Sequence, residues 1–105
     1  MSALIWSPFA DEAQARAAAA TLIEERLVAC ANLLPAMVSV FAWKGAVQSE
    51  NECAALFKTD EALLDEAIAR LADIHPYETP AIMGWPCRAG EATAAWLREQ
   101  TGAQG

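Results

Sequence analysis

Four stretches of the chain have the hydrophobic pattern of β-strands, either as short apolar runs or as apolar residues at every second position. They cover residues 3–7, 30–43, 47–58 and 81–85. Proline cannot donate to a strand ladder, so Pro8 is expected to end the first strand and Pro35 to mark an edge position or a bulge in the second. Lys44-Gly45 predicts a tight turn between the two long strands, since glycine readily adopts positive φ. This turn would place Trp43 opposite Ala46.

A helix is predicted between the first two strands. Asp11 can cap its N-terminus, with Gln14 three residues later as in a capping box. Apolar residues then recur at spacings of three and four to about Leu27, which predicts one buried stripe. The stripe consists of Ala13, Ala17, Ala20, Ile23 and Leu27.

A second helix follows the hairpin, and a third lies near the end of the chain. Thr59 is the predicted cap of the second helix, and Pro76 should stop that helix at His75. Its apolar face comprises Leu64, Ala67, Ile68, Leu71 and Ile74. The third helix is expected to start after Gly90 and to end near Gly102.

The predicted order is β-α-β-β-α-β with an added C-terminal helix. This is the order of the ferredoxin-like α+β fold, in which two helices cover one face of a four-stranded antiparallel sheet. No linker or repeat divides the chain, so residues 1–105 are expected to form a single domain. The hairpin strands outrun the helices, which would leave Phe41 and Trp43 exposed. Exposed edges and aromatic patches favour association, so we expect a homo-oligomer.

Composition narrows the partners and the location. The chain is 55% hydrophobic and carries a net charge of -7, which disfavours nucleic acids and anionic membranes as partners. No apolar run approaches the ~18 residues that span a bilayer. No basic residue precedes the short apolar run Ala3-Leu4-Ile5-Trp6, so no signal peptide is expected and the predicted location is the cytoplasm.

The three cysteines are odd in number and lack CxxC spacing, which argues against a disulfide framework or a structural zinc site. The hairpin register predicts Cys30 opposite Thr59 and Cys53 opposite Ala36, so these two cysteines are not cross-strand partners. We expect Cys30, Cys53 and Cys87 each to behave as a small buried hydrophobe.

The loop at residues 75–80 concentrates the candidate chemistry. It holds the only histidine and the only tyrosine, and its two prolines should make it stiff. Lys58 ends an apolar strand and is the expected partner of Glu78. With these two residues, His75 and Tyr77 could line a polar pocket between subunits that holds an anion or a small metabolite. The alternatives are helix capping by His75 and an interface salt bridge between Lys58 and Glu78.

No enzymatic activity is expected. The sequence has no Ser-His-Asp, HExxH or EF-hand pattern and no glycine-rich phosphate loop. Cysteine with histidine is the minimum for a thiol nucleophile. Cys30, however, follows the first predicted helix instead of lying at a helix N-terminus, where a thiolate is favoured.

Several segments together resemble the CutA divalent-cation tolerance family. Residues 25–32 resemble its "ERLAACVN" element, residues 41–45 its "YxWxG" hairpin, Glu52 with Lys58-Thr59 its "E…KT" strand end, residues 75–80 its "HPYExP" loop, and Trp96-Leu97 the tryptophan of its final helix. The elements occur in order across nearly the whole chain. The resemblance implies a ferredoxin-like fold assembled as a PII-like trimer through the long hairpins. It also implies a role in tolerance of divalent metals, with copper binding in some members.

The chain departs from the family where the resemblance implies copper ligands. In members proposed to bind copper, a cysteine at the end of the first strand and a His-His pair are the ligands. Here Ser7 and Ile74 replace two of them, so only His75 carries over as a metal ligand. Phe41 replaces the usual hairpin tyrosine, and Ala81 a frequent glutamate. A copper site needs at least two soft or borderline donors, so weak copper binding and no obligatory cofactor are expected.

Two functional hypotheses follow. The first is a small trimeric cytoplasmic protein involved in divalent metal-ion tolerance or response. The second is a PII-like regulatory module that binds a small ligand at the subunit interface. The residues expected to line this inter-subunit pocket are Trp43, Lys58, His75, Tyr77 and Glu78.

Overall fold

A computed structural model describes residues 1–103 of the chain. Its strands are β1 (Ser2–Phe9), β2 (Cys30–Trp43), β3 (Ala46–Asp60) and β4 (Met83–Cys87); its helices are α1 (Glu12–Glu24), α2 (Leu64–Ile74) and α3 (Glu91–Thr101), with a 3-10 turn η1 (Glu61–Leu63) before α2. The strands form one antiparallel sheet in the order β2-β3-β1-β4. The predicted ferredoxin-like order with an added C-terminal helix is confirmed.

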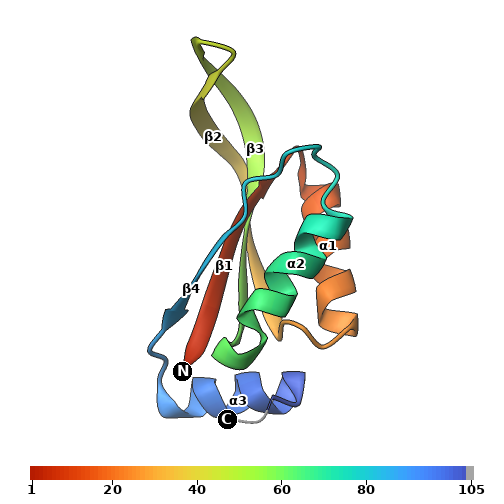
Figure 1. The fold of residues 1–105 in the computed structure, drawn as a ribbon, viewed down its shortest axis with the longest axis vertical. Helices are drawn as coiled ribbons and strands as arrows, with labels where there is room; N and C mark the ends of the chain where they lie inside the picture. Colours follow the sequence, from red (N-terminus) through yellow and green to blue (C-terminus); the bar gives the residue numbers. More distant parts are fainter. Residues whose placement is uncertain (104–105) are drawn as a thin grey trace.

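The helices are placed unequally around the sheet. α1 and α2 lie on one face, α3 crosses the end near the N-terminus, and the β2–β3 hairpin projects beyond α1 and α2 (Figure 1). The core fills the space between the sheet and these two helices. Its largest fully buried apolar side chains include Ile5, Phe9, Leu22, Phe57 and Leu71. No helix among the described residues is long and apolar enough to cross a membrane.

α1 begins at its predicted cap Asp11, but the reciprocal capping-box bond to the Gln14 side chain does not form, and the helix buries a different face. The Asp11 carboxylate accepts a 2.9 Å hydrogen bond from the Gln14 backbone N–H, as a cap should. The helix ends at Glu24 instead of near Leu27. Its buried residues are Ala15, Ala18, Ala19 and Leu22, whereas Ala13, Ala17, Ala20 and Ile23 of the predicted stripe are exposed. Alanines lie on several sides of α1, so the apolar period does not single out one face and packing against the sheet decides.

β1 continues through Pro8 to Phe9, so the prediction that Pro8 ends the strand is wrong. Pro8 faces Ala54 of β3, while the pairing of β1 with β4 has already stopped at Trp6. The Pro8 carbonyl accepts a hydrogen bond from His75 on the side that β4 has left. The missing proline N–H therefore lies where the ladder has ended, and the strand loses no bond.

The hairpin turn has the predicted register, with Trp43 opposite Ala46 and positive φ at Lys44 and Gly45. β2 is an edge strand, and its register shifts between Leu34 and Met37, so both readings of Pro35 are confirmed.

This bulge shifts the pairing of β2 with β3 by one residue between Cys30 and Leu34. Cys30 lies opposite Lys58 and not opposite Thr59, and Cys53 lies opposite Phe9 of β1. The neighbour predicted for Cys30 is therefore wrong, whereas Cys53 falls at the register shift between Leu34 and Met37, where the β2–β3 pairing is interrupted. The conclusion that Cys30 and Cys53 are not partners holds, because they pair with different residues.

Thr59 does not cap the second helix. It is fully buried in β3, and its hydroxyl donates a 2.7 Å hydrogen bond to the Leu27 carbonyl. Asp60 caps the following turn instead, accepting from the Ala62 N–H. α2 ends at Ile74 with His75 as its C-cap, as predicted.

The last elements differ from prediction only at their boundaries. β4 spans Met83–Cys87 and so starts and ends two residues later than the predicted strand. α3 begins after Gly90, and Gly102 ends it in the left-handed conformation with φ of 69°.

A substitution at Gly84 tests how closely β4 packs against α2. A Cβ at this position would lie 2.8 Å from Leu64 Cδ1, 3.0 Å from Ile68 Cδ1 and 3.2 Å from the Leu4 carbonyl oxygen. We expect Gly84→Ala to lower the free energy of unfolding by about 1–3 kcal/mol through overpacking, measured by urea denaturation. Gly90→Ser is the matched control, because a Cβ there has no atom within 4 Å and serine is favourable at the N-cap of α3. Equal losses in the two variants would contradict the close packing of β4.

Candidate functional site

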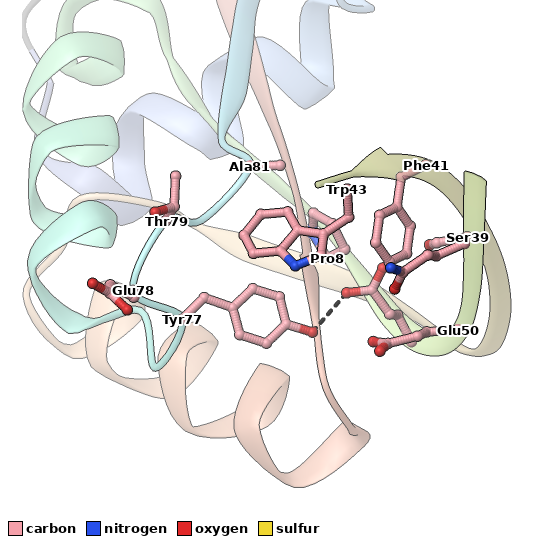
Figure 2. Close-up of a pocket in the computed structure, with 11 residues that line it drawn as sticks. Pro8, Ser39, Phe41, Trp43, Glu50, Tyr77, Glu78, Thr79 and Ala81 are labelled. Atoms are coloured by element: carbon pink, nitrogen blue, oxygen red, sulfur yellow. Dashed lines mark hydrogen bonds between the residues drawn. The ribbon is translucent and has the colours of Figure 1, made fainter. Parts of the chain in front are cut away.

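A groove of about 570 Å³ lies between the β2–β3 hairpin, the end of β1 and the loop after α2. Figure 2 shows Tyr77, Glu78 and Thr79 on one side and Phe41, Ser39 and Glu50 of the hairpin on the other, with Trp43 between them. The lining residues are Pro8, Ser39, Phe41, Trp43, Gln48, Glu50, Glu52, Tyr77, Glu78, Thr79 and Ala81. Alternation along the hairpin strands brings their lining residues to one face of the sheet.

His75 lies beneath this groove and ties its loop to β1. Its Nε2–H donates to the Pro8 carbonyl at 3.0 Å, and its Nδ1 accepts from the Tyr77 backbone N–H at 3.1 Å. Because the Tyr77 N–H can only donate, Nδ1 must be unprotonated and the ring neutral. The ring also stacks on Phe9, with centroids 4.2 Å apart and planes 8° from parallel. Burial lowers the pKa of His75, against smaller opposing effects of the Pro8 carbonyl and the Glu52 charge.

Tyr77 connects the loop to the hairpin. Its hydroxyl donates a 2.6 Å hydrogen bond to Glu52 Oε2, drawn as the dashed line in Figure 2. Burial raises the pKa of Tyr77 far above its usual value, and the bond to Glu52 and the nearby carboxylates of Glu52, Glu50 and Asp11 add to the shift. Tyr77 therefore stays a neutral donor to a carboxylate.

The structure brings together only part of the predicted site. Trp43, Tyr77 and Glu78 line the groove, and His75 is buried behind it, bonded to the lining residues Pro8 and Tyr77. Lys58 lies away from the groove. It pairs with Leu4 of β1 and is five positions along β3 from Cys53, which lies opposite Phe9. At ~3.3 Å per residue this is about 16 Å along the strand. The expected Lys58–Glu78 pair does not form among the ion pairs of residues 1–103.

Sequence reasoning missed Glu52 as a site residue. Glu52 is only 8% exposed, yet it lines the groove. The available signal was its position directly before the apolar run Cys53-Ala54-Ala55-Leu56-Phe57, where an acidic side chain has little access to water.

The described residues of one chain do not form a metal site. No three His, Cys, Asp or Glu side chains within residues 1–103 lie close enough together to hold a metal ion. Ser7 is fully buried, and its hydroxyl donates to the Ala81 carbonyl at 2.7 Å. Both nitrogens of His75 already have hydrogen-bond partners. The donor set therefore does not fit copper within the single chain.

Of the three cysteines predicted to be buried, only Cys53 is; Cys30 and Cys87 are half-buried. Burial raises the pKa of Cys30, an effect that the positive charge of Lys58 partly offsets. Burial also raises the pKa of Cys53, and the charges of Glu12 and Asp11 raise it further. A reactive cysteine needs the opposite shift, so neither environment activates a nucleophile.

Similar proteins are found over almost the whole chain. The family model described as CutA1 divalent ion tolerance protein matches residues 3–100. The divalent-cation tolerance protein CutA of Thermus thermophilus is 38% identical over 93 residues, which are 88% of this chain and 90% of that protein.

Solved structures show the same similarity in three dimensions. The crystal structure of the divalent ion tolerance protein CutA1 from Ehrlichia chaffeensis has a TM-score of 0.90 and 31% identity, covering 95% of this chain and 94% of that one. A structure described as the periplasmic divalent cation tolerance protein CutA from Archaeoglobus fulgidus also has a TM-score of 0.90, at 28% identity, and covers 96% of this chain and 99% of its own.

The hydrogen bonds of His75 predict a pH-dependent stability. The native pKa lies below the usual value of about 6.5, so the unfolded chain takes up this proton first as the pH falls. The stabilisation from neutral His75 is complete above about pH 6.5 and is lost as the pH falls toward the lowered native pKa.

His75→Gln isolates this effect, because it removes the titrating group. At pH 8 the variant should unfold with about 1–3 kcal/mol less free energy than wild type. That difference should shrink between pH 6.5 and pH 5, measured by urea denaturation at fixed protein concentration. A difference that stays constant or grows as the pH falls would contradict the neutral, doubly bonded imidazole.

Proposed function

The chain belongs to the CutA1 divalent ion tolerance family, and we propose that it acts in divalent metal-ion tolerance. In this proposal it acts by binding and not by catalysis, and it is a homotrimer in the cytoplasm. The relatives carry the name of a tolerance protein and not of an enzyme. Catalysis also has no support from the thiols, whose environments raise the pKa of Cys30 and Cys53.

The observation that supports a homotrimer is the apolar surface that a single chain leaves exposed to solvent. On the hairpin, Val38, Val40 and Val47 are 67%, 68% and 81% exposed. Patches of this kind on a single chain usually mark an interface, and closed symmetry is the usual outcome for identical chains.

The sheet face opposite α1 and α2 carries a second apolar surface. Leu4, Trp6 and their neighbours on β3 and β4 share this face by strand alternation, and Met83 and Trp85 there are 62% and 43% exposed. Burial of apolar area stabilises association by roughly 25 cal/mol per Å² before the costs of ordering. A homotrimer that covers the hairpin and this face therefore fits the exposed surface.

Copper binding is proposed to be weak, with His75 as its one candidate ligand. A metal at His75 would have to displace either the Tyr77 N–H or the Pro8 carbonyl from the ring. Further donors would have to come from another subunit, because no three suitable side chains meet within residues 1–103. Both requirements lower the affinity.

The groove supports a second candidate, a PII-like regulatory module that binds a small ligand at the subunit interface. Its volume of about 570 Å³ falls in the range of small-molecule sites. Trp43, Tyr77 and Glu78 lie at this groove. In this proposal, Lys58 would reach the site from a neighbouring subunit.

Charges placed on the hairpin should break the assembly. Wild-type protein is expected to have three times the chain mass of 11.2 kDa in light scattering coupled to size exclusion. Val38→Glu/Val40→Glu should shift it to the monomer at micromolar concentration, because two carboxylates would be buried without partners.

Ala13→Glu/Ala17→Glu is the matched control, since both alanines are exposed on α1 away from these surfaces. It should keep the wild-type mass. A wild-type monomer, or a hairpin variant with the wild-type mass, would refute the proposed assembly.

Calorimetry with cupric ion tests the metal proposal. We expect a dissociation constant of about 10 µM or weaker for wild type, and weaker binding still for His75→Ala. Cys87→Ser serves as the comparison variant and should leave the titration unchanged. Tight stoichiometric binding that survives His75→Ala would exclude His75 as the ligand. In a bacterial strain without its own member of the family, expression of the wild-type chain should increase growth in the presence of copper.

A further inference from the structure

Glu52 is a buried carboxylate without a cationic partner among residues 1–103. The residue is 8% exposed, and its Oε2 accepts from the Tyr77 hydroxyl at 2.6 Å. None of the ion pairs within residues 1–103 includes Glu52. A buried charge is costly unless it is paired, and one neutral donor does not neutralise it. The carboxylate borders the groove, so a cation in the groove would supply the missing charge.

The other residues that line the groove also favour a positively charged ligand. Glu50 and Glu78 add two carboxylates, and no Lys, Arg or His is among the residues described as lining the groove. Phe41, Trp43 and Tyr77 form its aromatic surface (Figure 2). The negative faces of aromatic rings attract organic cations, most strongly when water is excluded.

Resting on the second candidate function above, but with the groove free of the neighbouring subunit's Lys58, we propose that this groove binds a small organic cation of the alkylammonium class. The ammonium group lies against Glu52 and an aromatic face of the groove, and a second amine can reach Glu50 or Glu78. An anionic ligand is disfavoured, because three carboxylates and no basic side chain line the groove in one chain. A metal ion is disfavoured as well, because residues 1–103 hold no cluster of three suitable donors.

The test is calorimetry of the full chain with 1,4-diaminobutane and with choline, both as chloride salts, at constant ionic strength. 1,4-Butanediol and succinate serve as the neutral and the anionic probes. Both cations should bind and raise the melting temperature, and the diol and succinate should do neither.

Two variants examine the groups that recognise the cation. Glu52→Gln should weaken binding at least about tenfold, because it removes the charge-assisted bond. The glutamine still accepts from Tyr77, so Glu52→Gln should keep or raise the wild-type melting temperature without ligand. Trp43→Leu should weaken binding about three- to tenfold through loss of the aromatic face. Glu24→Gln, an exposed change on α1, should leave binding unchanged and is the matched control.

The remaining outcomes separate this inference from the function on which it rests. Binding of succinate or 1,4-butanediol but of neither cation would overturn the cation proposal and leave a regulatory ligand site intact. No binding of any of these probes would overturn both. Cation binding that appears only in Lys44→Ala/Lys58→Ala would mean that a lysine of a second copy fills the groove, which overturns a free ligand. Equal affinity in wild type and Glu52→Gln would also overturn the proposal.

Discussion

The site depends on the two hydrogen bonds of the His75 ring. The Nε2–H bond to Pro8 joins the loop to the end of β1, and the Nδ1 bond from Tyr77 holds the next turn of the loop. Both bonds need the neutral ring, and stacking on Phe9 keeps it in place. Tyr77 is thereby aimed at Glu52 across the groove, at 2.6 Å. The only histidine of the chain therefore shapes the groove from below instead of lining it.

This arrangement changes what the family relationship implies for the chain. The protein has the family's fold and loop, but Ser7 and His75 are both engaged in hydrogen bonds within the chain. The groove beside them is lined by carboxylates and aromatic rings. A fold shared with other CutA proteins thus leaves room for a ligand preference that this chain's own side chains decide.

The features that sequence predicted well are those with a local physical cause. Asp11 caps α1 because its carboxylate reaches the Gln14 N–H three residues away. Lys44-Gly45 forms the turn because positive φ is needed there, and Pro76 stops α2 because a proline disfavours the helical conformation of the residue before it. Together with hydrophobic spacing, such causes determine the order of strands and helices, and the order in turn implies the ferredoxin-like fold.

Tertiary structure decided the features that depend on distant residues. A bulge near Pro35 shifts the lower half of β2 by one residue and moves Cys30 opposite Lys58. The pairing of β3 with β1 places Lys58 opposite Leu4, away from the groove within one chain. Glu52 becomes a site residue only because Tyr77, 25 positions later, is folded against it. Sequence alone thus determined the elements and their order, since caps, turns and apolar spacing act over a few residues. Burial, register and charge pairing in the groove required the folded chain, because they arise between segments that only the sheet brings together.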